Sequence, residues 1–237
     1  KDFEEVGQGP KLILDAVLKW RFHKNFTLWM GQTKLPGNRE RVISSQKLQF
    51  VDRSILNSKF NLDRDMSVQL HSEFEAHNAL IRFAAAISTG DGRDITAGNF
   101  GGFGYTGRFE FLPMGKFTSK GDYFSSDLSR ESKPKLSLAF TYDFNNNASR
   151  EGGRLGNFLK DANDEYLHSN LTTLFADMMF KYRGLSVLAE MARKESSVKN
   201  SGFASGTAVS AQFGYLIDCP KFKNVEFALR YSKINPD

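Results

Sequence analysis

Cysteine, proline and long apolar runs are all scarce in this sequence. The 237 residues include one cysteine, Cys219, which excludes an internal disulfide framework. The six prolines are scattered, so they mark no proline-rich linker. No stretch approaches the roughly 20 apolar residues of a membrane-spanning helix, and the mean hydropathy is −0.42. These absences exclude a helical membrane protein, and the length allows one large β-domain or two small ones.

Catalytic and metal-binding motifs are also missing. The sequence has no HExxH motif, no paired cysteines and no phosphate-binding loop. Of its four histidines, His23 and His77 fall at expected turns, His168 in a loop, and His71 beside Glu73 on a strand face. A Ser–His hydrolase set against a membrane would need His71 on the opposite face. We therefore expect no enzyme, no metal site and no cofactor.

The charge of the chain is mildly basic. Its formal net charge is +5 and its pI is near 9.2. The lysines and arginines are scattered rather than clustered, which argues against nucleic acid as a partner. A small positive excess suits a surface or lumen that attracts anions, although it also suits ordinary proteins.

What the sequence has in abundance is two-residue alternation with aromatic residues on one face. It contains 22 Phe and 7 Tyr, and residues 225–232 place Phe227, Leu229 and Tyr231 opposite Glu226 and Arg230. Successive side chains of a strand point to opposite sides, so such a segment separates an apolar from a polar environment. The same pattern predicts ten strands, at residues 11–22, 26–35, 64–75, 79–89, 103–112, 134–144, 171–182, 184–193, 206–217 and 225–232.

The lengths of the strands and of their connections favour a membrane barrel. Strands of about ten residues suit a tilted crossing of the bilayer. Short links alternate with long ones at 36–63, 90–102, 145–170 and 194–205, as in outer-membrane barrels. Residues 113–133 break this rhythm, and we interpret them as an elaboration at the periplasmic end or as a miscounted strand. The predicted fold is all-β: an antiparallel transmembrane β-barrel, with residues 1–237 as one barrel domain.

Two other folds share the alternation. A soluble β-sandwich would have shorter strands with polar outer faces. A lipocalin-like barrel could instead turn the apolar faces inward, to line a cavity, and the polar faces outward. Both stay open as alternatives to the membrane barrel.

The strand faces opposite the apolar ones would line a pore. The candidate pore-lining cations are Lys19, Arg21, Arg82, Arg108, Lys181 and Arg230, with Lys11 on the same face. The carboxylates on these faces are Asp15, Glu73, Glu110, Asp143, Asp177, Glu190 and Glu226. Seven charges of each sign give a balanced lumen, which does not select anions by itself. We therefore expect the constriction of the pore to lie on the long loop 36–63, where Arg39 and Arg41 are the candidate constriction residues. The alternative is that these two arginines lie at a solvated loop tip.

Several stretches are similar to the phosphate-selective porin O and P family of outer-membrane channels. They are TGRFEFLPMGKF (106–117), GDYFSSDLSRE (121–131), PKLSLAFTYDFNNNA (134–148), LFADMMFKYRG (174–184) and ALRYSKINP (228–236). Weaker similarity lies in GQTKLPGNRER (31–41) and DRDMSVQLHSEF (63–74). The stretches follow the order of the family along nearly the whole chain.

The resemblance implies a bacterial outer-membrane barrel of sixteen strands, assembled as a homotrimer. The chain is therefore expected to be an incomplete portion of the mature protein. The predicted function is passive diffusion of small solutes, with phosphate and other anions as candidates. Two alternatives stay open: a porin-like structural subunit of a larger outer-membrane assembly, and a soluble β-rich binding protein. No residue of the family's phosphate site can be matched to this sequence position by position.

Overall fold

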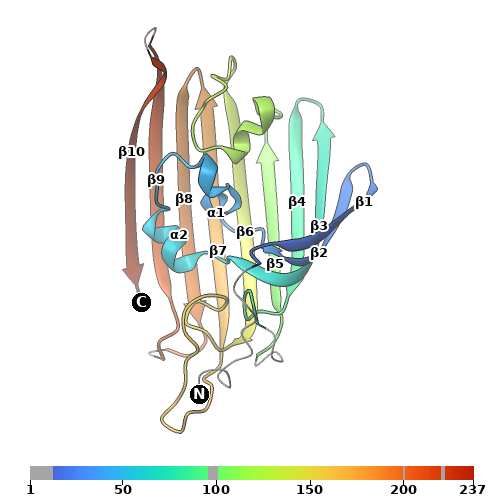
Figure 1. Cartoon of the computed structure of the whole chain (residues 1–237), viewed down its shortest axis with the longest axis vertical. Helices are drawn as coiled ribbons and strands as arrows, with labels where there is room; N and C mark the ends of the chain where they lie inside the picture. Colours follow the sequence, from blue (N-terminus) through green and yellow to red (C-terminus); the bar gives the residue numbers. More distant parts are fainter. Residues whose placement is uncertain (1–12, 96–100, 200, 220–221) are drawn as a thin grey trace.

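The computed structural model describes residues 13–95, 101–199, 201–219 and 222–237. Ten strands form one antiparallel sheet in which each strand pairs with its neighbours in the sequence (Figure 1). The strands are β1 (Ala16–His23), β2 (Phe26–Lys34), β3 (Arg64–Ala76), β4 (Ala79–Ser88), β5 (Gly104–Leu112), β6 (Lys135–Ala148), β7 (Ser169–Tyr182), β8 (Leu185–Ser196), β9 (Gly206–Cys219) and β10 (Phe222–Pro236). The predicted all-β antiparallel fold is confirmed. Residues 11 and 12 of the first predicted strand, and with them Lys11, lie outside the described residues.

The sheet is curved but open. Figure 1 shows β1 and β2 inclined against the other strands, so that the sheet bends around the segments on its inner face. Over the described residues, β1 and β10 form the two edges and do not pair with each other. The ten strands therefore do not close on themselves, and the size of the complete barrel stays a prediction.

The outer face of the sheet is apolar and exposed. On β10, the exposed fractions are 66% for Phe227, 72% for Leu229 and 62% for Tyr231. Phe83, Phe109 and Phe140 lie opposite one another across β4, β5 and β6; such cross-strand aromatic pairs stabilise a sheet. Within the part of the chain that the structure describes, no helix is long and apolar enough to span a membrane.

Three connections fold onto the inner face of the sheet. The first inserted segment (36–63) contains the helices α1 (Arg39–Val42) and α2 (Ile55–Phe60) and the 3-10 helix η1 (Ser45–Lys47). The second inserted segment (113–133) contains the 3-10 helix η2 (Thr118–Tyr123). The third inserted segment (149–168) contains two isolated β-bridges, Arg150 with Phe158 and Lys160 with Tyr166, and no named helix or strand. The sequence analysis predicted no helices, because two-residue alternation detects only strands. These helices are too short to show the repeat of apolar residues that would reveal a helix.

The hydrophobic core lies between the sheet and these segments. Leu56 and Phe60 of α2 pack with Phe175 of β7 and with alanines of β4, β8 and β9. Ile43 and Phe117, from the first and second inserted segments, pack with Met179 of β7 and with leucines of β4, β5 and β8. The apolar core therefore fills much of the inner face, and only part of that face stays open.

Residues 113–133 lie at the end of the sheet where the short turns are, such as the link between β3 and β4 at 77–78. They contain η2 and no strand, so the count of ten strands is not in error there. We call this the short-turn end, and the opposite one the long-loop end.

Candidate functional site

An open groove of about 1110 Å³ runs along the inner face of β1–β5. Its floor is formed by inward-facing residues such as Val17 of β1, Thr27 of β2 and Ala84 of β4. The first inserted segment supplies Pro36 and Val42 to its wall, and the second supplies Tyr123. The groove lies where a solute path through a barrel would run.

The charges that line the groove are unbalanced. Eight cations face four carboxylates. The cations are Lys19, Arg21, Lys24, Lys34, Arg82, Arg108, Lys116 and Lys120. The carboxylates are Asp15, Glu73, Glu75 and Glu110. Arg82 and Arg108 also pair with Asp122 and Asp177, which lie outside the groove lining, so the free excess is smaller than four charges. A cavity with a net positive charge raises the local concentration of anions.

Most of this imbalance comes from Lys24, Lys34, Lys116 and Lys120, which outnumber the one further carboxylate, Glu75, because the charges predicted from the sequence contribute four cations and three carboxylates to the groove. The inserted segments cover the remaining predicted carboxylates of the wall. Asp143 is bound by Arg154 of the third inserted segment, with an N–O distance of 2.9 Å. Glu190 accepts a hydrogen bond of 2.6 Å from the backbone N–H of Glu40. Glu226 accepts hydrogen bonds from Gln49 (2.7 Å) and Ser126 (2.7 Å). Asp177 is covered in the same way by Arg39, so four of the seven inward carboxylates predicted from the sequence do not reach the groove.

A network of buried ion pairs joins the groove wall to the first inserted segment. Arg108 of β5 donates to both oxygens of Asp177 on β7, at 2.7 and 2.9 Å, and to Glu110 at 2.8 Å. Arg82 of β4 pairs with Glu73 at 2.8 Å and with Glu110 at 3.4 Å. Arg108 also donates to the carbonyl oxygen of Gly37 at 2.7 Å. Arg82 and Arg108 therefore line the groove, as predicted candidates, but their charges are largely neutralised by these carboxylates.

Arg39 lies at the centre of the same network. Its side chain is fully buried, and it pairs with Asp177 at 3.2 Å and with Glu110 at 3.1 Å. It also donates to Ser137 at 2.9 Å. Burial alone would lower the pKa of Arg39, but Glu110 and Asp177 outweigh it and raise the pKa above its ordinary value. The arrangement fixes α1 to the wall and keeps the guanidinium out of the groove.

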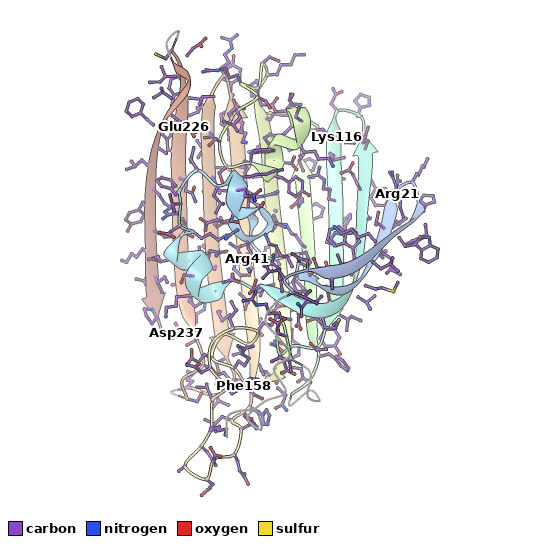
Figure 2. All side chains as sticks on the ribbon, in the orientation of Figure 1. Arg21, Arg41, Lys116, Phe158, Glu226 and Asp237 are labelled. Carbon is purple, nitrogen blue, oxygen red and sulfur yellow. The ribbon has the colours of Figure 1, made fainter. Side chains whose placement is uncertain are left out.

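Arg41 occupies a different environment on the same short helix (Figure 2). It pairs with Asp63, and 14% of its side chain is exposed. Burial, together with repulsion from Arg53 and Arg64, lowers the pKa of Arg41 to about 10. Arg41 therefore stays charged at neutral pH within a crowded group of cations, next to Val42 of the groove wall.

The other candidates from the sequence are divided between the groove and the inserted segments. Lys19 and Arg21 line the groove, and the Lys19 ammonium lies 3.6 Å from the centre of the Trp29 ring. Lys181 is buried beneath the second inserted segment. Arg230 donates to the carbonyl oxygen of Asp52 at 2.6 Å and lies over the ring of Phe50. Only part of the predicted ladder is thus brought together.

The sequence analysis missed Trp29 and four of the groove cations, Lys24, Lys34, Lys116 and Lys120. Trp29 stacks on His71 with ring centres 4.1 Å apart; its position between Leu28 and Met30 places it on the inward face and could have identified it. Lys120 belongs to an irregular segment, where no periodic signal predicts the direction of a side chain.

Among the described residues, no group of three or more His, Cys, Asp or Glu side chains could hold a metal ion. A family model described as phosphate-selective porin O and P matches residues 1–123, just over half of the chain. This chain belongs to the phosphate-selective porin O and P family. The match includes every residue that lines the groove, from Asp15 to Tyr123. Comparisons with curated proteins and with solved structures gave no significant match.

Membership in the porin O and P family agrees with the β-rich fold and with a channel rather than an enzyme. The stretches at 134–148, 174–184 and 228–236, for which the sequence analysis predicted similarity to the family, lie beyond the matched residues, so that similarity stays a prediction. They form β6, β7 and β10, which carry the inserted segments rather than the groove.

Proposed function

We propose that this protein is a porin of the bacterial outer membrane through which small solutes, preferentially anions, diffuse passively along the groove of β1–β5. The observation that carries the proposal is the excess of eight cations over four carboxylates in that groove. A passing anion loses part of its hydration, and Lys and Arg side chains compensate for this loss. Phosphate is a candidate solute through the family, and the groove chemistry fits a small oxyanion.

The apolar outer face supports the membrane location. Side chains such as Phe140 (49% exposed) and Leu229 (72% exposed) would be solvated in a soluble protein. Contiguous apolar surface of this extent is unusual for a soluble monomer, whereas lipid would cover it. This argues against the soluble β-rich binding protein.

The open edges of the sheet support a larger barrel. An unpaired strand edge is costly in hydrocarbon, because each free N–H and C=O group there costs several kcal/mol. We propose that further strands pair with β1 and β10 and close a barrel, of sixteen strands if the family pattern holds. Assembly as a homotrimer is a further expectation from the family.

The solute path is tested by recording the full-length protein in a planar bilayer under a tenfold KCl gradient. We expect an anion-selective reversal potential for the wild type. Lys19→Glu combined with Lys24→Glu should move it toward cation selectivity, because both side chains line the groove. Lys199→Glu, an exposed position outside the groove lining, is the matched control. A cation-selective wild type, or a double variant that behaves as the control does, would refute the anion preference.

A second candidate function is favoured by the filled part of the lumen. Three inserted segments and their apolar core occupy the inner face of β6–β9. Such a barrel could serve as a structural subunit of a larger outer-membrane assembly, with little conduction. A folded protein with heat-modifiable mobility that gives no channels would favour this role over the porin.

A further inference from the structure

The second inserted segment crosses the inner face at the short-turn end and is fastened to strands on both sides. On one side, Asp122 pairs with Arg82 of β4. On the other, Arg130 donates to the carbonyl oxygen of Leu216 on β9 at 2.9 Å, and Ser126 donates to Glu226 of β10 at 2.7 Å. The segment therefore spans the sheet from β4 to β10, and Figure 1 shows it in green across the upper part of the inner face.

Lys181 of β7 holds the middle of this segment. Its ammonium donates to the carbonyl oxygens of Gly121 (2.7 Å), Phe124 (2.8 Å) and Ser126 (2.6 Å). All three N–H donors of the ammonium are thus used, and the residue is 1% exposed. One side chain of the wall thereby fixes three backbone positions within six residues of the segment.

Two carboxylates make the segment rigid in itself. Asp127 accepts from the backbone N–H of Gly184 at 2.8 Å, which ties the segment to the turn between β7 and β8. Glu131 accepts from the N–H of Thr118 at 2.6 Å and from its hydroxyl at 2.9 Å. The end of the segment is thereby tied back to the start of η2, so that η2 cannot move independently of the wall.

The free side of the segment faces the groove with Lys116, Lys120 and Tyr123. Ser119 and Lys120 have left-handed backbone conformations, with φ of 51° and 57°. This conformation is unfavourable for residues other than glycine and persists only where the surroundings impose it. Lys116 pairs with Glu73 and Glu75, whereas no carboxylate is within ion-pair distance of Lys120 among the residues that the structure describes. Lys120 therefore presents an unpaired charge at the short-turn mouth of the groove.

We propose that residues 113–133 form a second constriction of the solute path, at the short-turn end of the groove. In this arrangement Lys181 is the positioning residue and Lys120 the residue that sets charge preference at that mouth. The inference rests on the proposed porin function and goes beyond it, because it assigns selectivity to a segment that neither the strand ladder nor the long loops include.

The role of Lys120 is tested by charge reversal in the full-length protein in planar bilayers. Lys120→Glu changes the charge at the mouth by two units, which disfavours anions and favours cations by equal amounts. At about 8 Å in water, with the screening of about 0.1 M salt, this lowers the anion-to-cation permeability ratio roughly fivefold. Lys133→Glu makes the same change on the same segment, at an exposed position outside the groove lining, and should leave the ratio unchanged.

The role of Lys181 is tested by a double-mutant cycle. Lys181→Met removes the three donors at nearly equal side-chain length, so the segment should loosen and single-channel conductance should rise. Once the segment is loose, Lys120→Glu should lose most of its effect on permeability in the Lys181→Met background. This non-additivity distinguishes positioning from a general effect on stability.

The outcomes separate the inference from the proposed function. A wild type that never conducts overturns both. A conducting wild type in which Lys120→Glu and Lys133→Glu give the same permeability ratio overturns the second constriction alone. Additive effects of Lys120→Glu and Lys181→Met overturn the positioning role of Lys181. Should Lys181→Met fail to fold, the comparison of Lys120→Glu with Lys133→Glu still decides the constriction.

Discussion

Arg39 and Arg41 allow a direct test of what holds the first inserted segment in place. They lie two residues apart on α1, and Arg→Met removes the same charge and hydrogen-bond donors at each position. Arg39 is fully buried between Asp177 and Glu110, whereas Arg41 is partly exposed and pairs with Asp63. We expect Arg39→Met to release the segment and Arg41→Met to leave it in place.

The expected magnitudes follow from burial. Removing one partner of a buried ion pair costs about 3–5 kcal/mol. Arg108 still neutralises Asp177 and Glu110 in Arg39→Met, so we take the lower end, about 3 kcal/mol, which is roughly a hundredfold in an opening equilibrium. The Arg41–Asp63 pair is also mostly buried, but Arg64 remains 3.7 Å from Asp63 in Arg41→Met. Asp63 therefore keeps a cationic partner, and we expect a cost of about 1 kcal/mol, roughly fivefold. The loss of repulsion from Arg53 and Arg64 offsets part of that cost for Arg41.

Amide hydrogen exchange measures these openings in the folded protein. The N–H of Ile43, bonded to the carbonyl oxygen of Arg39, and that of Ser58, bonded to Ser54, report on α1 and α2. Their exchange should accelerate roughly a hundredfold in Arg39→Met and less than tenfold in Arg41→Met, while β6 and β7 stay protected. Equal acceleration in both variants would refute the view that the buried network anchors the segment.

Two further predictions concern the sheet itself. Phe140→Arg places a charge in the middle of the outer face and should lower the free energy of unfolding by about 2–4 kcal/mol if that face meets lipid. The control, Phe103→Arg just before β5, should lower it by about 0–1 kcal/mol. Both values are measured from the urea midpoint of the heat-modifiable band. An unchanged free energy of unfolding in Phe140→Arg would contradict a lipid-facing outer surface. Gly31→Ala should detach β1, because Gly31 has φ of +126° and an added Cβ would lie 2.2 Å from the carbonyl oxygen of Ala16. Gly107→Ala is the control, because its added Cβ meets no atom within 4 Å. Amide hydrogen exchange in β1 should therefore accelerate in Gly31→Ala and stay unchanged in Gly107→Ala.

The strands could be predicted from sequence because the physical cause is local. A strand between an apolar and a polar environment must alternate, and residues such as Phe227 and Arg230 show this without knowledge of the fold. The inward position of Lys19 follows from the same rule. Gly31 interrupts regular alternation in β2 for a local reason too, since its φ of +126° is one that other residues rarely adopt.

The distribution of charge in the lumen could not be predicted, because it depends on contacts between residues far apart in sequence. Alternation places Asp177 and Arg82 on the same inner face, but only the fold brings Arg39 over Asp177 and leaves Arg82 open to the groove. The seven charges of each sign counted on the strands thus describe the bare wall. The inserted segments cover carboxylates and cations of this wall alike, and the cationic excess of the groove comes mainly from lysines outside the predicted ladder, namely Lys24, Lys34, Lys116 and Lys120.

The central claim is that solutes pass along the groove of β1–β5 and not beneath the inserted segments. Its most direct test is thiol block of single cysteines in the full-length protein, with Cys219→Ser as the background. Thr27→Cys lies in the groove, and Thr173→Cys lies on β7 at a position that is 1% exposed. A charged thiosulfonate reagent should sharply reduce the conductance of Thr27→Cys and leave that of Thr173→Cys unchanged. Block at Thr173→Cys without block at Thr27→Cys would contradict the account.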